Sequence, residues 1–501
     1  MADTTEHSWH MLHNGADSDK RESHDALAVF RLHKAELRST VPVAASDDVR
    51  LGNSIASTAA PPSEKDIADA TEAAKKIHTA RDSVTHWIGG RTADYKAIFR
   101  QIEKQPPSQM GLLQEKYAEL YGHADSATGR GTGMLDDLKA SLKPDEFDRV
   151  TRLISEKQIN DVPAEKRVDG SSLITDSGEF HVGANHLKTA DGREFDLYIP
   201  QNARQEVGPD GKVGMPLVVA MHGVEPDKDN PDMMERESGL NVEAERKGVA
   251  VAYLRPVYRP ESALLGAVQK DIGAWNMQGT TGFLPSDPSY DDAKFLKDAL
   301  AKVNSGLKVD HSRVGVVGMS DGGRFAQDFA AANPGVFSSV VSFEGTHMSG
   351  DPVVPKAGEN VMIVHGLNDH TLPWDQQGRW SRGILSVLSS PIISNTELSR
   401  PAEQVEMWLK ADGAKGPNTE QWLQVNDSDQ SGPKPQSDDG ITRTYDYKGT
   451  RGEVRVDLVR GAEHAIDDYK NVGGMILGEV TYLDFSSKGV QFILDHPTKP
   501  Q

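Results

Sequence analysis

The sequence of 501 residues contains no cysteine. Disulfide bonds, thiolate nucleophiles, iron–sulfur clusters and cysteine-ligated zinc are therefore excluded. No apolar run approaches the roughly 20 residues that a membrane-spanning helix needs, and residues 1–30 lack the apolar stretch of a signal peptide. We therefore expect a cytoplasmic protein, and secretion by a signal-independent route stays open.

Positive charge is also scarce, because 55 lysine and arginine residues face 75 aspartate and glutamate residues, for a net charge of −20. Such a field repels polyanions and anionic lipid surfaces unless a local basic patch or a bridging cation offsets it. The sequence has no such basic patch, so we expect no nucleic-acid partner. The length predicts one to three domains.

Three regions of the chain differ in pattern. Residues 1–60 are polar and irregular, which predicts a flexible N-terminal segment. Between residues 61 and 160, apolar residues recur every three or four positions, as at Ile77, Ala80 and Val84. Glycine, serine or proline separates the apolar stripes, so this region predicts a small all-α bundle of five short helices. Residues 161–501 have strand patterns and form the third region.

The third region predicts an α/β fold. Residues 179–186 and 193–199 alternate between apolar and polar, which indicates an opening antiparallel pair. Short, nearly continuous apolar runs follow at residues 217–221, 249–254, 314–317, 339–343 and 361–365. Helical stretches such as 291–303 and 324–333 separate most of them, so we expect a three-layer structure around a mostly parallel sheet. Residues 413–440 are polar and predict a loop insertion, and 453–459 predicts the last strand.

The sharpest motif is Gly318-Met319-Ser320-Asp321-Gly322, between the strand pattern that ends at Val317 and the helical pattern that begins at Arg324. A serine on a tight strand-to-helix turn needs small residues on both sides, because larger side chains would collide there. Ser320 is therefore the candidate nucleophile.

A serine needs a base and an acid that orients the base. In this architecture the acid comes first and the histidine second, each after a later strand. Asp369 follows the run 361–365, and His464 follows the run 453–459. An aspartate in a turn and a surface histidine are the plain alternatives, but the order Ser320, Asp369, His464 is the one that catalysis requires.

Acyl transfer also needs backbone donors for the oxyanion of the intermediate. One candidate is the N–H of Asp321, directly after the serine. The other is the N–H of Val224, because the His222-Gly223 turn follows the apolar run 217–221. A plain turn at the end of a strand is the alternative for this second position.

From about Ser171 to the C-terminus the sequence resembles the polyhydroxybutyrate depolymerase and feruloyl esterase group of α/β-hydrolases. The matching pieces occur in family order at residues 217–223 (LVVAMHG), 274–276 (AWN), 291–296 (DDAKFL), 309–314 (VDHSRV), 318–323 (GMSDGG), 365–369 (HGLND) and 461–464 (GAEH). The resemblance implies hydrolysis of carboxylic esters through an acyl-enzyme on Ser320, with His464 as base and Asp369 as its partner. We expect no cofactor and no metal site.

The sequence departs from this group near the predicted cleft. Secreted members often carry cysteines where this chain has Val224 and Ala274, and they have an aromatic residue after the catalytic histidine, where this chain has Ala465. These departures leave the acyl group open. Trp275 and Asn276 are candidates for the substrate cleft, and burial of the tryptophan in a loop that caps a helix is the alternative.

The helical region is similar to a single annexin repeat at residues 73–80, 97–99, 117–122 and 135–139. Annexins bind calcium through a glycine-rich loop and a distant carboxylate. Here the loop is 89–92, with Arg91 where a glycine belongs, and Ser141 stands at the carboxylate position. Calcium prefers charged oxygen ligands, so we expect no binding of calcium or membranes. A protein partner for this helical module stays open.

Together these observations predict a small helical bundle (61–160) followed by an α/β-hydrolase domain (161–501) that acts as a serine esterase on 3-hydroxyalkanoate or hydroxycinnamate esters. Another hydrolase of the same fold, such as a peptidase or a lactone hydrolase, uses the same groups. A non-catalytic binding or adaptor protein is the alternative from another class.

Overall fold

The computed structural model describes most of the chain from Pro62 onward. The described residues are 62–81, 93–122, 133–157, 159–175, 178–225, 234–235, 238–262, 269–276, 289–347, 353–356, 358–369, 371–375, 399–426, 432–462, 464, 470–472, 475–476 and 483–498. They all belong to one unit, Pro62–Gln501, which holds the helical bundle and the sheet together. The predicted segment 1–60 and the glycine-rich loop 89–92 lie outside the described residues.

The helical region contains five α-helices among the described residues, as predicted. They are α2 (Glu64–Arg81), α3 (Tyr95–Glu103), α4 (Met110–Tyr121), α5 (Met134–Ser141) and α6 (Pro144–Glu156). Asp94 caps α3 by accepting a hydrogen bond from the N–H of Ala97. Proline prevents α3 and α4 from joining, since Pro106 and Pro107 lead into the short 3-10 turn Pro107–Gln109.

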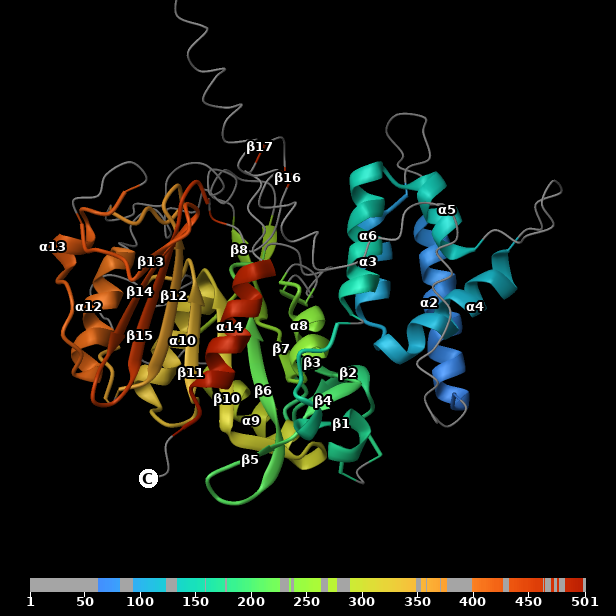
Figure 1. The fold of residues 1–501 in the computed structure, drawn as a ribbon, viewed down its shortest axis with the longest axis horizontal. Helices are drawn as coiled ribbons and strands as arrows, with labels where there is room; N and C mark the ends of the chain where they lie inside the picture. Colours follow the sequence, from blue (N-terminus) through green and yellow to red (C-terminus); the bar gives the residue numbers. More distant parts are fainter. Residues whose placement is uncertain are drawn as a thin grey trace, which may run out of the picture. The chain divides into compact units, whose positions relative to one another are not determined.

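The α/β prediction is confirmed by a large sheet that is parallel in its centre and antiparallel at both edges (Figure 1). The order along it is β13-β14-β15-β12-β11-β10-β6-β7-β3-β2. From the first edge, the bounds are Ser437–Asp438, Thr442–Lys448, Glu453–Val459, Asn360–Gly366, Ser339–Phe343, Val309–Met319, Val213–Met221, Ala250–Leu254, Glu194–Ile199 and Gly183–Lys188. The six strands from β15 to β7 run parallel to one another. Their carboxyl ends therefore lie at the same edge of the sheet.

Short strands make up the rest of the β-structure. β5 (Glu206–Val207) pairs with β6, and three small pairs are separate from the large sheet. They are β1 (Arg167–Asp169) with β4 (Asn202–Arg204), β8 (Val257–Ser262) with β9 (Gln269–Ala274), and β16 (Lys470–Val472) with β17 (Met475–Ile476).

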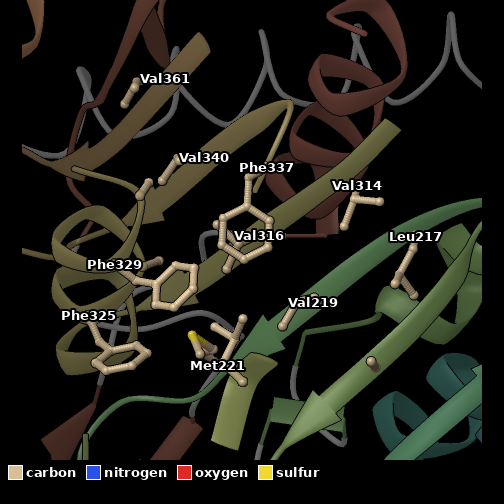
Figure 2. Packing of buried hydrophobic residues seen from close by; sticks show 14 of the residues in the cluster. Leu217, Val219, Met221, Val314, Val316, Phe325, Phe329, Phe337, Val340 and Val361 are labelled. Atoms are coloured by element: carbon tan, nitrogen blue, oxygen red, sulfur yellow. The ribbon is translucent and has the colours of Figure 1, made fainter. Parts of the chain in front are cut away.

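The central strands are buried on both faces, which explains their nearly continuous apolar sequences. Along β6, Leu217, Val219 and Met221 pack into one hydrophobic cluster, and Val218 and Ala220 pack into another. Alternate residues of a strand point to opposite faces. Each face of the sheet therefore has its own core. Figure 2 shows part of the first core, in which β6, β10 and helix α10 contribute side chains.

Helices cover both faces and complete the three layers. Helices α9 (Asp292–Gly306), α10 (Asp321–Ala332) and α12 (Pro401–Asp412) contribute to the first core. Helices α8 (Leu240–Lys247) and α14 (Leu483–Asp495) contribute to the second. Figure 1 shows α14 in front of the sheet, over β10. In the part of the chain that the structure describes, no helix is long and apolar enough to cross a membrane.

The helical bundle packs directly on the edge of the α/β region. Val242 of α8 belongs to the hydrophobic core of the bundle. Directly after α6, the buried Lys157 donates a hydrogen bond to the hydroxyl of Tyr198 on β3, and that hydroxyl lies 2.9 Å from a carboxylate oxygen of Glu245. Burial lowers the pKa of Lys157 and raises that of Glu245. These buried hydrogen bonds link the bundle to the sheet, and breaking them would leave buried polar groups unpaired and lower the stability of the protein.

The structure differs from the sequence-based expectation between residues 413 and 448. The polar stretch 413–440 is more than a loop: it contains helix α13 (Thr419–Trp422), whose Trp422 is buried in the first core. Strand β14 then precedes β15, the strand predicted at residues 453–459, and the two pair with each other. A single tryptophan in a polar stretch has no periodicity, so the pattern that reveals longer elements was absent there.

Candidate functional site

Ser320 lies on the tight turn between strand β10 and helix α10. Its backbone has φ 52° and ψ −117°, a combination that side chains rarely tolerate. The flanking glycines make the turn feasible. A Cβ on Gly318 would come within 2.3 Å of the carbonyl oxygen of Gly322, and a Cβ on Gly322 would come within 2.4 Å of the carbonyl oxygen of His222. The motif therefore has the strained geometry that its sequence predicts.

The structure brings the three predicted side chains together. Nε2 of His464 lies 2.9 Å from Oγ of Ser320, and Nδ1 of His464 lies 2.8 Å from Oδ2 of Asp369. Ser320 follows β10, Asp369 follows β12 and His464 follows β15. The loops of the last two are joined, since the N–H of Asn368 donates to the carbonyl of Ala462. Three residues far apart in sequence thus form one hydrogen-bonded chain at the carboxyl edge of the sheet.

The environment of Asp369 keeps its carboxylate ionised. Burial raises its pKa, but the charge and hydrogen bond of His464 outweigh burial and lower the pKa to about 2. Its other oxygen accepts hydrogen bonds from the N–H groups of Thr371 and Leu372. Because an ionised carboxylate only accepts hydrogen bonds, Nδ1 of His464 is the nitrogen that donates its proton in a hydrogen bond to Asp369. Its Nε2 then presents a lone pair to the hydroxyl of Ser320.

The predicted oxyanion loop lies beside the serine. A Cβ on Gly223 would approach the Cβ of Ser320 to 3.1 Å, so the backbone of the His222-Gly223 turn contacts Ser320 directly. Val224 follows in this turn and is partly exposed. The N–H of Asp321 is the first of helix α10, where no carbonyl of the helix can accept it. Burial lowers the pKa of His222 to about 4, so this ring is neutral near pH 7.

The order of the strands, with a serine, an acid and a histidine after three of them, matches one known architecture. The model of the dienelactone hydrolase family matches residues 286–384, a segment that contains both Ser320 and Asp369. The chain has the α/β-hydrolase fold. The predicted resemblances to the depolymerase and feruloyl esterase group and to an annexin repeat stay predictions.

One curated relative is "Putative esterase NocK" of Nocardia uniformis subsp. tsuyamanensis, which is 29% identical to this chain over 206 residues. The match covers 40% of this chain and 53% of the relative, so the chain spans about half of that protein's length.

Two solved structures are similar to this α/β-hydrolase fold at low identity. The acetyl xylan esterase from Aspergillus awamori is 15% identical with a TM-score of 0.36, covering 62% of this chain and 99% of that one. The S-formylglutathione hydrolase from Agrobacterium tumefaciens is 14% identical with a TM-score of 0.36, covering 66% and 99%. Likeness at this level carries no argument about the substrate.

Trp275 and Asn276 are both buried, so the structure has the second of the two predicted arrangements. The N–H of Asn276 donates to Asp292, and the backbone N–H of Asp292, the first residue of helix α9, donates to the carbonyl of Asn276. The indole N–H of Trp275 donates to the carbonyl of His222 over 2.8 Å. Trp275 therefore supports the turn at His222, and Asn276 is linked to the first residue of helix α9.

A charged network links this tryptophan to Asp321, the residue after Ser320. Asp321 accepts a hydrogen bond from the backbone N–H of Trp275, and Arg324 donates to the carbonyl of Trp275. Arg324 also pairs with Asp321 and Asp328, and all three side chains are buried. Sequence reasoning missed Arg324 and Asp328. Their spacing on one face of the helix, with Asp321 one turn before Arg324, was the signal that could have revealed this network.

Sequence reasoning also missed Glu344, which follows strand β11. Its Oε2 lies 3.6 Å from Nδ1 of His464. Among the described residues, Glu344, Asp369 and His464 form a group whose nitrogen and oxygen ligand atoms lie within 4.8 Å of one another, as a metal site would require. We assign no metal to this group, because Nδ1 of His464 already donates its proton to Asp369.

Proposed function

We propose that this chain is a serine esterase that hydrolyses carboxylic esters through an acyl-enzyme on Ser320. The observation that carries the proposal is the hydrogen-bonded chain from Oγ of Ser320 through His464 to Asp369. A serine hydroxyl becomes a nucleophile when a correctly oriented base can take its proton. The distances and the ionised Asp369 meet these conditions.

In the first step, Oγ of Ser320 attacks the ester carbonyl, and its proton passes to Nε2 of His464. The resulting imidazolium is stabilised by Asp369. The negative oxygen of the tetrahedral intermediate faces the N–H groups of Asp321 and Val224, at the positive end of helix α10. His464 then gives its proton to the leaving alcohol. Water repeats the sequence on the acyl-enzyme and releases the acid.

The proposed substrates carry a small or medium acyl group, such as a 3-hydroxyalkanoate or a hydroxycinnamate. The resemblance of residues 217–464 to depolymerases and feruloyl esterases supports this class, and the similarity to a curated relative described as an esterase supports ester hydrolysis in general. Long-chain triglycerides are expected to be poor substrates.

A lactone hydrolase is the second candidate, and one observation favours it. The segment that matches the dienelactone hydrolase family contains the nucleophile and the acid. A lactone is an internal ester, so the same groups open it, and the leaving alcohol stays attached to the acyl-enzyme. A peptidase or a non-catalytic adaptor has no comparable support.

Two measurements test the proposal. A fluorophosphonate probe should label the wild-type protein at Ser320 and leave Ser320→Ala unlabelled. A panel of aryl esters that varies in acyl length, with hydroxycinnamate esters and small lactones added, should show turnover of short or aromatic esters above that of emulsified triglyceride. Absence of labelling would favour the adaptor, and preference for lactones would favour the second candidate.

A further inference from the structure

Glu344 occupies an unusual backbone position beside the site. It follows strand β11, which lies between the strands that carry Ser320 and Asp369. Its φ is 48°, and among the described residues Ser320 and Glu344 are the two non-glycine residues with positive φ. The N–H of Glu344 donates to the carbonyl of Val364 on β12, which holds this conformation. Strain of this kind persists where the surrounding structure enforces it, and it is concentrated at functional sites.

The carboxyl group of Glu344 faces the same nitrogen of His464 as Asp369 does. Oδ2 of Asp369 lies 2.8 Å from Nδ1 of His464, and Oε2 of Glu344 lies 3.6 Å from it. Neither acid side chain is exposed. Gly366 leaves room for the glutamate, because a Cβ there would approach its Oε1 to 3.0 Å.

The other titratable groups around His464 can be named. On the opposite side of its ring, Nε2 contacts the hydroxyl of Ser320. On strand β12, the ring of His365 lies 3.6 Å from Asp369, and burial lowers the pKa of His365, so that ring is neutral near pH 7. Among these described neighbours, Asp369 and Glu344 are therefore the two groups that can place negative charge beside Nδ1.

We propose that Glu344 is a positioning residue, a second acid that supports His464 together with Asp369 and holds Nδ1–H when Asp369 is replaced. The inference rests on the proposed function. When His464 takes the proton of Ser320, positive charge appears on a buried ring, and a second carboxylate at this distance lowers its energy. No proton moves to Glu344 in this step. Glu344 follows β11, which lies between β10 and β12. Its side chain therefore reaches the ring of His464 from one strand, and Asp369 reaches the same ring from the next.

The test compares Glu344→Gln, Asp369→Asn and the double variant, with Glu359→Gln as the matched control. Glu344→Gln and Glu359→Gln each replace one buried glutamate. Glu359, however, precedes β12 and lies at the amino end of that strand, whereas the site lies at the carboxyl end. We expect Asp369→Asn to lower kcat/KM on an activated aryl ester by roughly 10²-fold. The double variant should lose roughly 10⁴-fold, the loss expected where no second acid is present.

The pH profile separates charge support from a merely structural role. Glu344→Gln should move the acidic limb of the kcat/KM profile to lower pH by roughly one unit, because the imidazolium loses a negative neighbour, and Glu359→Gln should leave that limb in place. If Glu344→Gln does not fold, as judged by thermal unfolding, Glu344→Asp takes its place. The shorter side chain keeps the carboxylate but moves it away from His464, so the acidic limb should again move to lower pH.

A roughly 10⁴-fold loss in Asp369→Asn alone, together with an unchanged profile in both Glu344 variants, would overturn the inference. The proposed function fails separately, if the wild-type protein neither reacts with a fluorophosphonate nor hydrolyses any ester. Labelling at Ser320 with identical profiles for Glu344→Gln and Glu359→Gln would leave the esterase standing and remove the second acid.

Discussion

The two ends of strand β12 hold buried acids that behave in opposite ways. After its carboxyl end, Asp369 accepts hydrogen bonds from two backbone N–H groups and from His464, and its pKa falls to about 2. Before its amino end, Glu359 accepts one hydrogen bond from the N–H of Gly335 and lies beside Asp412. Burial raises the pKa of Glu359 and of Asp412 to about 7.

The difference shows that burial alone does not decide the charge of an acid. His464 and hydrogen-bond donors stabilise the carboxylate of Asp369 against burial, whereas burial dominates at the other end, and for Asp412 the neighbouring Glu359 adds to it. In the proposed mechanism the first arrangement is needed, because His464 requires a permanently negative neighbour. The pair of Glu359 and Asp412 has no such role, and it lowers the stability of the protein near neutral pH.

The largest effect is expected at the carboxyl end of the sheet. Ser320→Ala should reduce turnover of an activated aryl ester by at least roughly 10⁴-fold, because the acyl-enzyme cannot form. His464→Ala should be about as damaging, and the double variant should add little, since the two residues act as one unit. Thermal unfolding should stay close to that of the wild type. An unchanged rate in Ser320→Ala would contradict the mechanism.

Lys157 is a third buried titratable group, and it lies away from both ends of β12. Its replacement should change the stability of the protein but not its catalysis. Lys157→Met should destabilise the protein by about 3 kcal/mol, because Glu245 and Tyr198 lose their buried cationic partner. The value of kcat/KM at temperatures well below unfolding should not change. Lys76→Met is the control, because Lys76 is largely exposed and its ion pair with Glu72 is exposed too. Equal unfolding midpoints for the two variants would argue against a structural role for this contact.

Trp275→Phe should have a smaller effect on catalysis. Phenylalanine keeps the packing of the ring but removes the N–H that donates to the carbonyl of His222. The turn that carries the N–H of Val224 then loses its support, so we expect roughly a 10-fold lower kcat/KM, with stability lower by about 1 kcal/mol. Steady-state kinetics and thermal unfolding measure the two changes. Wild-type kinetics in this variant would mean that the turn does not depend on the indole.

The smallest effect is expected at the amino end of β12. The raised pKa values of Glu359 and Asp412 mean that the folded state favours their protonated forms. Their contribution to the free energy of unfolding is therefore fully present below the ordinary carboxyl pKa, near 4, and is lost as the pH rises towards about 7. Glu359→Gln or Asp412→Asn should raise the unfolding midpoint by a few degrees above pH 7 and leave it unchanged near pH 4. A stabilisation that does not vary with pH would argue against this explanation.

Much of the fold followed from local patterns. The helical spacing around Ile77 and the apolar runs of β6 and β12 repeat at short range, because a helix or strand directs side chains with a fixed period. The motif around Ser320 was equally visible, since its glycines are needed by a turn of five residues. The order of Ser320, Asp369 and His464 indicated the site because strands of a parallel sheet end at one edge.

The tertiary structure alone decided the rest. The positive φ of Glu344 and its approach to His464 depend on β11 lying between β10 and β12, which no local pattern states. Trp275 was recognised as a candidate, yet only packing shows that its indole supports the turn at His222. The buried Trp422 stands alone in a polar stretch, so no periodic pattern could reveal it, whereas the alternating sequence of β14 (Thr442–Lys448) was a signal that sequence reasoning missed. The amino-acid sequence by itself determined the longer helices and strands and the turn that carries Ser320. The distances between side chains from different strands arise only when the sheet sets their register, because contacts between distant segments depend on every element that separates them.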